Sequence, residues 1–448
     1  MKGRPRLNAI AGPILGEFLL GMSVAMAGLW LASHTSDAAA GAFSMSNQVL
    51  ETLFVVFRVL AIGLGVVIGQ ALGGGGAESA RRTAMVALAA SSWAGLFAVG
   101  CLLFGNRAVL ALLNAPDAVV PLAAPFLQLL APALLLEAYN LSMAAILRAH
   151  LHVRDSLAVM VVMHGTHLLL AIPLMRGVGG WDGLGLNGYA LAMLASRAVG
   201  LALHLWLWRR RMQLVPAAPD WWRVRWPLLV PVLRIGLPGA AVEFVYRAAF
   251  MVSLAATARL GVEALATHAY TLQILKYVLL VSMSIGWATE IMVGRLVGAG
   301  ELRQADALVR KGVRNGLLAS GGFALLVALC APWVLHAFTR DPLIIAAAQT
   351  LLWLSIALET GRVFNLVLNG ALRATGDAIY PALASMGSLI LVMGVGSFWM
   401  GRWFGLPGIW LVYALDEWIR GLLILARWTR RGWLEHARDT QRRVKSAA

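Results

Sequence analysis

The sequence predicts an all-α integral membrane protein in which twelve transmembrane helices form two pseudo-symmetric six-helix lobes. Composition gives the first reason. Of the 448 residues, 60% are hydrophobic and only 13% are charged, and the mean hydropathy is +0.76, whereas a soluble domain carries about 25% charged residues. The alternating apolar and polar pattern of a membrane β-barrel is absent from the sequence. A bundle of apolar helices therefore fits the chain.

An internal repeat gives the second reason. Subtracting 225 from residue numbers in the second half of the chain recovers the first half, as shown by the matches of Gln273 to Gln48, Gly294 to Gly69, Asn365 to Asn140 and Leu372-Arg373-Ala374 to Leu147-Arg148-Ala149. Parallel repeats of this kind are common in membrane transporters, where the substrate path lies between the halves. We expect an N-lobe over residues 1–215 and a C-lobe over residues 216–448.

Hydropathy places six helices in each copy. The first six are expected at 10–33, 43–73, 84–104, 118–147, 156–176 and 186–208. The first of them is too long for the 7–15-residue apolar region of a signal peptide, so we expect it to be retained. The second six are expected at 234–257, 266–298, 312–335, 343–372, 380–401 and 406–428. Between the copies, residues 209–234 interleave Trp with Arg, which predicts a linker at the level of the lipid headgroups.

The net charge of +16 raises the possibility of a nucleic-acid partner, but the distribution of the charge excludes one. Most Lys and Arg residues fall on the side of both termini, including the basic start from Met1 to Asn8. The other side carries only Arg107, Arg176, Arg259, Arg340 and Arg402. Lys and Arg collect on the cytoplasmic side of membrane proteins. We expect a monomer in a bacterial-type inner membrane with both termini in the cytoplasm.

The sequence has no motif for ATP binding and no constellation of catalytic side chains. The four-glycine run Gly73-Gly74-Gly75-Gly76 lacks the Lys-Ser/Thr of a phosphate-binding loop. We therefore expect neither an enzyme nor a bound cofactor, and any transport should depend on an ion gradient.

Several motifs are specific when taken together. They are Ile235-Gly236-Leu237-Pro238 at the start of the seventh expected helix, the Val293–Gly300 segment that ends the eighth, and the turn Leu372-Arg373-Ala374-Thr375-Gly376-Asp377 after the tenth. In these motifs the chain resembles the multidrug and toxic compound extrusion (MATE) family. The resemblance covers nearly the whole chain and implies a twelve-helix transporter that exchanges a coupling cation for a small molecule.

The chain departs from this family at one place. Many members carry an aspartate midway along the first helix, where it binds the coupling ion, and the matching segment Met26-Ala27-Gly28 has no carboxylate. Glu17 and Glu51 are the available replacements. A desolvated Glu suits a proton carrier, which favours protons over sodium.

A charged side chain inside a membrane is costly, so each one is a functional candidate. The coupling-ion candidates are Glu17, Glu51, Glu137, Glu243 and Glu359, and the polar cavity candidates are Gln48, Arg58, Asn140, Arg247, Gln273, Lys276, Arg362 and Asn365. Helical spacing pairs three carboxylates with arginines, which is also compatible with a purely structural role: Glu243 with Arg247, Glu359 with Arg362, and Glu417 with Arg420.

Glu51 and Arg58 lie two helical turns apart on one helix face. We interpret this spacing as too long for a direct bond, so that Gln48 or a ligand would bridge the two side chains. His164 and His167 could titrate near neutral pH or ligate a metal. No third ligand is near them in the sequence, so we interpret them as satisfied packing residues and expect no metal.

At two repeat positions the copies carry opposite charge: Glu51 matches Lys276, and Glu137 matches Arg362. These residues would face one another across a central cavity, or they changed independently in different surroundings.

The function that fits best is a proton- or sodium-coupled antiporter that exports amphipathic, cationic small molecules by alternating access. Its partners would be the substrate, the coupling cation and the bilayer. The alternative is a lipid-linked oligosaccharide flippase of the same superfamily. Its anionic substrate would require a cavity dominated by Arg58, Arg247, Lys276 and Arg362. A non-transporting scaffold would not need so many charges inside the membrane.

Overall fold

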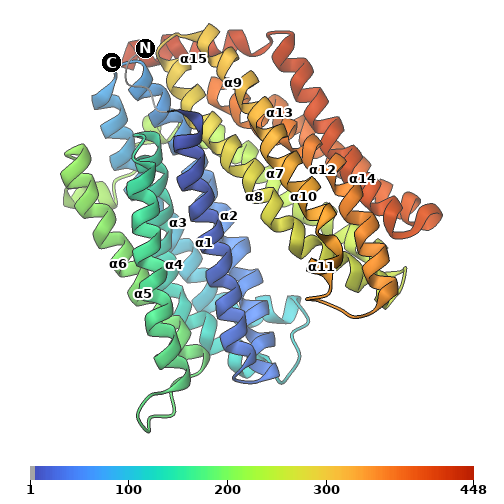
Figure 1. The fold of residues 1–448 in the computed structure, drawn as a ribbon. Helices are drawn as coiled ribbons and strands as arrows, with labels where there is room; N and C mark the ends of the chain where they lie inside the picture. Colours follow the sequence, from blue (N-terminus) through green and yellow to red (C-terminus); the bar gives the residue numbers. More distant parts are fainter. Residues whose placement is uncertain (1–5, 448) are drawn as a thin grey trace. The chain divides into compact units, whose positions relative to one another are not determined.

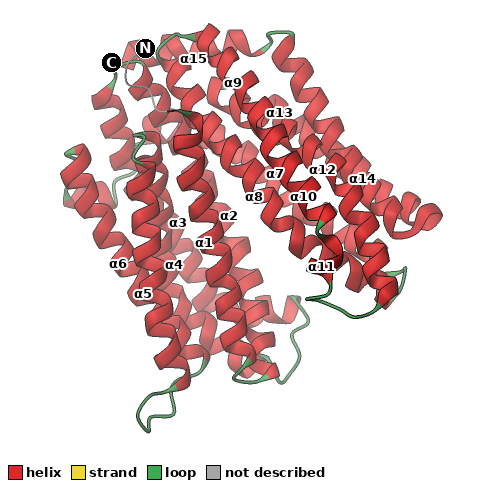
Figure 2. Cartoon of the chain, in the orientation of Figure 1, coloured by secondary structure: helices red, strands yellow, loops and turns green. Residues whose placement is uncertain are grey.

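The computed structural model describes residues 6–447, and these residues fold into helices with no strand among them (Figures 1 and 2). Lys2 and Arg4, which belong to the basic start of the chain, lie outside the described residues. The first half consists of α1 (Leu7–Ser33), α2 (Asp37–Gly73), α3 (Ala77–Leu112), α4 (Val120–Ala149), α5 (Val153–Arg176) and α6 (Leu186–Met212).

The second half begins with a short 3-10 turn in the linker. Its elements are η1 (Ala218–Trp221), α7 (Trp226–Ala258), α8 (Val262–Gly298), α9 (Leu302–Gly316), η2 (Leu317–Gly321), α10 (Gly322–Leu329), α11 (Ala331–Leu335), α12 (Pro342–Thr375), α13 (Ile379–Ser388), η3 (Leu389–Val395), α14 (Gly396–Thr429) and α15 (Trp433–Ala447). The π-helical segments η2 and η3 interrupt long helical runs without ending them.

Helix ends coincide with residues that satisfy free backbone groups. The Ser36 hydroxyl accepts a hydrogen bond from the Ala39 amide at 3.0 Å and caps α2. Asp341 does the same for α12 by accepting from the Leu343 amide at 2.9 Å, and Pro342 follows at the first helical position. Gly376 ends α12 in a left-handed conformation (φ 99°, ψ −5°), which glycine adopts without steric cost.

Eleven helical stretches within the described residues are long and apolar enough to cross a membrane. The last of them, Ile379–Thr429, has 51 residues, more than twice the roughly 20 that a bilayer needs. Gly405 has non-helical angles (φ 61°, ψ −148°) and divides it. The resulting twelve-helix architecture in two halves confirms the predicted fold class.

The backbone also shows where the repeat changes its offset. Gly185, just before α6, has φ 54° and ψ −132°, close to the angles of Gly405, and the two residue numbers differ by 220. With this shorter offset Gly188 matches Gly408, and a Cβ atom on either would lie within 2.3 Å of a backbone carbonyl oxygen. Glycine is therefore required at these close approaches. The last helix of each half follows the shorter offset.

Contacts divide the chain into two compact units. The N-terminal unit comprises Gly16–Ile68 and Ala77–Gly236, and among the described residues the C-terminal unit comprises 6–15, Gly69–Gly76 and 237–447. Phe57 and Phe126 are fully buried in the core of the N-terminal unit, as is Trp410 in that of the C-terminal unit. The predicted lobe boundary at residues 215 and 216 stays a prediction.

The start of α7 packs within the N-terminal unit because two glycines allow backbones to touch. A Cβ atom on Gly63 would lie 2.1 Å from the Val232 carbonyl oxygen, and one on Gly236 would lie 2.0 Å from the Val59 carbonyl oxygen. Small residues permit such close helix packing in membranes. The linker before α7 is also hydrogen-bonded to α3, because the Ser92 hydroxyl donates to the Trp221 carbonyl at 2.5 Å.

Candidate functional site

The N-terminal unit contains a cavity of about 260 Å³, here called the N-terminal cavity. Helices α1, α2, α4, α5 and α6 contribute its walls. Apolar residues such as Phe43, Phe54 and Phe126 make up much of the lining, and the polar lining residues are Asn47, Glu51, Arg58, Glu137, His164, His167, Tyr189 and Arg197. Ala25 also lines it, so the part of α1 directly before Met26-Ala27-Gly28 faces the cavity and has no carboxylate there.

Two ion pairs hold the acidic groups of this cavity. Arg58 donates from Nη2 to Glu51 Oε2 at 2.9 Å, and Arg197 Nε lies 2.6 Å from Glu137 Oε2. The expectation that Glu51 and Arg58 are too far apart for a direct bond is therefore wrong. A helical side chain leans toward the N-terminus of its helix, so the long Arg58 side chain extends back along α2 far enough to reach Glu51.

His164 and His167 lie on one face of α5, and both line the N-terminal cavity. They are buried, with 6% and 1% of their surface exposed. Among residues 6–447, no side chain or backbone group hydrogen-bonds to His164 Nδ1 or to either ring nitrogen of His167. The hydrogen bonds of the described residues therefore do not support the interpretation of the two residues as satisfied packing groups. His167 does contact the Tyr189 ring edge-on, with ring centroids 4.5 Å apart.

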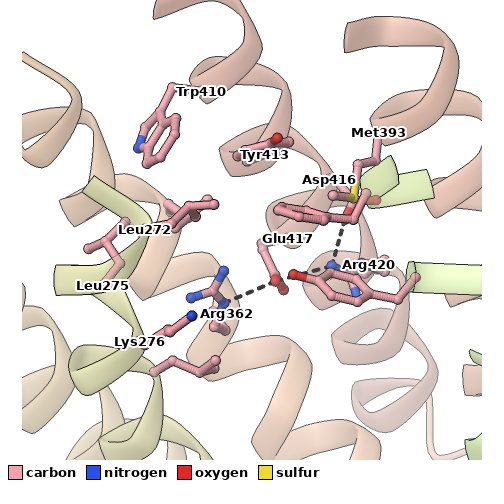
Figure 3. A pocket seen from close by; sticks show the side chains of 14 residues that line it. Leu272, Leu275, Lys276, Arg362, Met393, Trp410, Tyr413, Asp416, Glu417 and Arg420 are labelled. Carbon is pink, nitrogen blue, oxygen red and sulfur yellow. Dashed lines mark hydrogen bonds and ion pairs between the residues drawn. The ribbon is translucent and has the colours of Figure 1, made fainter. Parts of the chain in front are cut away.

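The C-terminal unit contains a second cavity of about 250 Å³, here called the C-terminal cavity (Figure 3). Aromatic side chains from α7 and α14 form part of its wall, namely Tyr246, Phe250, Trp410 and Tyr413. Its charged lining residues are Lys276, Arg362, Asp416, Glu417 and Arg420. The predicted candidates Lys276 and Arg362 thus share one cavity.

A buried charge network occupies one side of the C-terminal cavity. Glu417 is its centre: its Oε1 accepts from Arg362 Nε and lies near Arg420 Nη2, both at 3.1 Å. Its Oε2 accepts from Asn365 Nδ2 at 2.8 Å. Arg420 also donates to Asp416 at 2.5 Å. Figure 3 shows the contacts of Glu417 with Arg362 and Arg420, and that of Arg420 with Asp416.

The helical pairs expected from spacing are present in the structure. Arg362 contacts Glu359 as well as Glu417, and Arg247 donates to Glu243 Oε1 at 3.1 Å. Lys276 differs from the arginines because it is exposed and its hydrogen bond goes to the Gln273 side-chain oxygen, at 3.0 Å.

The two cavities lie at equivalent places in the two halves. With the main offset of 225, several lining positions correspond: Gly21 and Tyr246, Ala25 and Phe250, Asn47 and Leu272, Leu50 and Leu275, Glu51 and Lys276, Phe54 and Leu279, and Glu137 and Arg362. With the shorter offset of the last helix, Arg197 corresponds to Glu417. Each half thus has an ion pair between its fourth and sixth helices. In the first half the fourth helix carries the acidic partner, and in the second half it carries the basic one.

This reversal gives Glu137 and Arg362 partners inside their own units. Glu137 pairs with Arg197, and Arg362 with Glu359 and Glu417. That Glu137 and Arg362 face each other across a central cavity stays a prediction. Sequence spacing did not single out Arg197 or Glu417 as site residues, because the match between them appears only after the change of offset at Gly405.

The remaining candidates lie outside the cavity linings. Glu17 accepts from Arg148 Nη1 at 2.8 Å in a buried pair between α1 and α4. Asn140 supports the N-terminal cavity from behind, since its Nδ2 donates to the Arg197 carbonyl at 3.0 Å and its Oδ1 lies 3.1 Å from His204 Nδ1. Gln48 is exposed on α2 and is not among the lining residues.

Comparison with known proteins identifies the family. The model of the MatE family matches residues 13–172 and 238–398. The two matches cover more than half of the chain, and their first residues are related by the main repeat offset. The chain belongs to the MATE family. Its twelve helices and internal repeat are those of a multi-pass membrane transporter, as the sequence motifs predicted.

Individual MATE relatives align over nearly the full length. An uncharacterised transporter of Bacillus subtilis, YisQ, is 30% identical, and the alignment covers 96% of this chain and 95% of the relative. A probable multidrug resistance protein of Thermotoga maritima, NorM, is 24% identical over 99% of this chain and 96% of its own. A solved MATE structure in the bent conformation shares the fold with a TM-score of 0.88 at 16% identity, covering 97% and 96% of the two chains.

Proposed function

We propose that this protein is a proton- or sodium-coupled antiporter that exports amphipathic, cationic small molecules from the cytoplasm. The observation that carries the proposal is the pair of equivalent cavities, each of which combines apolar walls with buried carboxylates. An apolar wall binds the body of an amphiphile, and a carboxylate attracts its positive charge.

The C-terminal cavity offers a second attraction for a cation. Tyr246, Phe250, Trp410 and Tyr413 present aromatic rings beside Asp416 and Glu417. Aromatic faces attract organic cations, more strongly where water is excluded. A flat cationic dye would combine ring stacking with attraction to the acidic pair.

Exchange follows if the coupling cation and the substrate compete for the same site. A proton or sodium ion that enters from outside adds positive charge to the site and releases the substrate, and loss of that ion to the cytoplasm restores the site. Two homologous six-helix lobes support such alternation, because the internal repeats of transporters can move as rigid bodies. We propose a monomer in the inner membrane with both termini in the cytoplasm.

The cavity charges do not favour a flippase for anionic glycans. Such a substrate would require unpaired positive charge. Arg58, Arg247 and Arg362 are instead each paired with a carboxylate of their own helix. Lys276 is the fourth cationic residue proposed for that alternative. Among the ion pairs and hydrogen bonds of the described residues, its contact is with the side-chain amide of Gln273 and not with a carboxylate.

Ethidium efflux tests the proposal. Everted vesicles that contain the protein, and matched empty vesicles, receive a proton gradient or a sodium gradient separately. We expect ethidium movement against its own gradient under one of the two conditions, and only in vesicles with protein. Equal movement in both kinds of vesicle under both gradients would overturn the antiporter proposal.

A further inference from the structure

The N-terminal cavity contains two titratable groups that no ion pair holds within residues 6–447. His164 and His167 line it, and three of their four ring nitrogens are buried without a hydrogen-bond partner in this part of the chain. A buried polar group without a partner costs free energy. Buried polar groups are nearly always satisfied in proteins, so each exception requires an explanation. A site that binds a proton or water during function would explain why these ring nitrogens lack partners among the described residues.

The carboxylates of the same cavity are less suited to carry a proton. Glu51 bonds to Arg58, and Glu137 lies against Arg197. A neighbouring arginine stabilises the ionised form of a carboxylate and opposes protonation. Neither glutamate can be neutralised without leaving an arginine charge uncompensated in an apolar wall. The segment of α1 that faces the cavity, with Gly21, Val24 and Ala25, contributes no titratable group.

We propose that His164 and His167 form the proton-binding site that couples transport in this protein, and that the coupling cation is therefore the proton. The inference rests on the antiporter function proposed above. A neutral imidazole offers a ring-nitrogen lone pair that can bind one proton, and two rings at positions i and i+3 of one helix lie next to each other on the same face. One proton added to the pair fills the position that a cationic substrate group would otherwise take.

Charge balance explains the exchange. The groups that face the two imidazoles are Glu51 and Arg58 from α2, Glu137 from α4, and Tyr189 and Arg197 from α6. Two acidic and two basic groups cancel when the imidazoles are neutral. A protonated imidazole adds one positive charge, and a cationic substrate adds one as well. Both together would leave two uncompensated charges in about 260 Å³ of mostly apolar space, so each expels the other.

The proton balance is simple. In the outward-facing state an imidazole nitrogen lone pair accepts a proton from external water, and the cationic substrate leaves. In the inward-facing state the nitrogen returns the proton to cytoplasmic water, and a new substrate cation enters. Each transfer forms one bond and breaks one: the N–H bond forms as an O–H bond of a hydronium ion breaks, and on release the N–H bond breaks as water accepts the proton.

Proton release on substrate binding tests the site directly. Purified full-length protein in detergent, in weakly buffered solutions that range from acidic to neutral pH, is mixed with tetraphenylphosphonium while a pH indicator dye follows the released protons. We expect the wild-type protein to release about one proton for each bound cation. The double variant His164→Gln/His167→Gln should release at least tenfold less and should bind the cation with little dependence on pH.

The matched control is His204→Gln. His204 is also a buried histidine of the N-terminal unit, and no group of the described residues hydrogen-bonds its Nε2, but it does not line the cavity. We expect this variant to release protons as the wild-type protein does. Wild-type release by the double variant would overturn the proposal.

Infrared difference spectra of the wild-type protein provide a test that does not depend on the double variant being stable. Binding of tetraphenylphosphonium should remove imidazolium bands. Loss of the C=O band of a neutral carboxylic acid would instead place the proton on a glutamate or aspartate and overturn the histidine site. Absence of proton release from a protein whose vesicles show sodium-driven ethidium efflux would also overturn it, while the antiporter function would stand.

Discussion

Glu417 takes the position in the second repeat that Arg197 takes in the first. Each pairs with a residue of opposite sign on the fourth helix of its own half: Arg197 with Glu137, where Nε and Oε2 lie 2.6 Å apart, and Glu417 with Arg362, where Oε1 and Nε lie 3.1 Å apart. Reversing the charges of such a pair preserves the attraction, whereas changing one partner alone does not.

Exchanging the charges of the first pair should therefore be tolerated better than removing one of them. Glu137→Gln leaves Arg197 buried without a carboxylate, and breaking a buried pair in this way costs about 3–5 kcal/mol. The double variant Glu137→Arg/Arg197→Glu should recover at least half of that loss. Thermal unfolding of the purified variants in detergent measures both.

Arg81→Ala provides the surface control for this experiment. Its partner Glu78 is 3.7 Å away, and both side chains are more than half exposed, so the expected loss is below about 1 kcal/mol. If the charge exchange proves as destabilising as Glu137→Gln, the two positions are not interchangeable in sign.

Glu17 should prove structural. Its Oε2 accepts from Arg148 in a buried contact at 2.8 Å, and it does not line the N-terminal cavity. Glu17→Gln should lower the thermal midpoint clearly, since a buried arginine then lacks its charged partner. Protein that remains folded should keep the wild-type number of protons exchanged per substrate in vesicles. A normal midpoint combined with uncoupled efflux would instead assign Glu17 to the coupling site.

Two glycines on α2 provide a matched pair for testing helix packing. A Cβ atom on Gly63 would lie 2.1 Å from the Val232 carbonyl oxygen, whereas one on Gly65 would have no atom within 4 Å. Gly63→Ala should therefore force α2 and α7 apart at a cost of about 1–3 kcal/mol. Gly65→Ala should be neutral or slightly stabilising, because alanine favours the helix. Equal thermal midpoints for the two variants would contradict this packing.

Lys276 should set the preference of the C-terminal cavity between cations and neutral compounds. It is an exposed cation at the cavity wall whose hydrogen bond goes to Gln273, so its charge repels a positively charged substrate. Lys276→Gln should lower the KM for efflux of a cationic dye several-fold and leave the KM for a neutral analogue unchanged. Arg340→Gln, which alters a residue outside the lining, is the control. An equal change for both substrates would exclude an electrostatic role.

Local features of the fold could be predicted from the sequence, because they depend on residues near one another in the chain. Hydropathy located the helices, and helical spacing found the pairs of Arg247 with Glu243 and Arg362 with Glu359, which the structure contains. The spacing of Glu51 and Arg58 along the helix was not sufficient to predict their ion pair, since the direction of a long side chain decides which residues it can reach.

Contacts between distant helices could not be predicted in the same way. Arg148 is 131 residues from Glu17, and Arg373 is 83 residues from Glu290. These two arginines are equivalent in the repeat, yet they bond to carboxylates on different helices. The repeat therefore predicts where a charge lies and does not predict its partner, which depends on how the helices pack.

The reversed ion pair also limits the route by which the two halves diverged after duplication. From a common ancestral pair, one substitution in either half would have placed two like charges together inside the membrane, which is strongly unfavourable. A series of substitutions that passes through an uncharged pair avoids such a pair of like charges. The variant Glu137→Gln/Arg197→Gln tests such an intermediate, and it should unfold at a higher temperature than either single substitution.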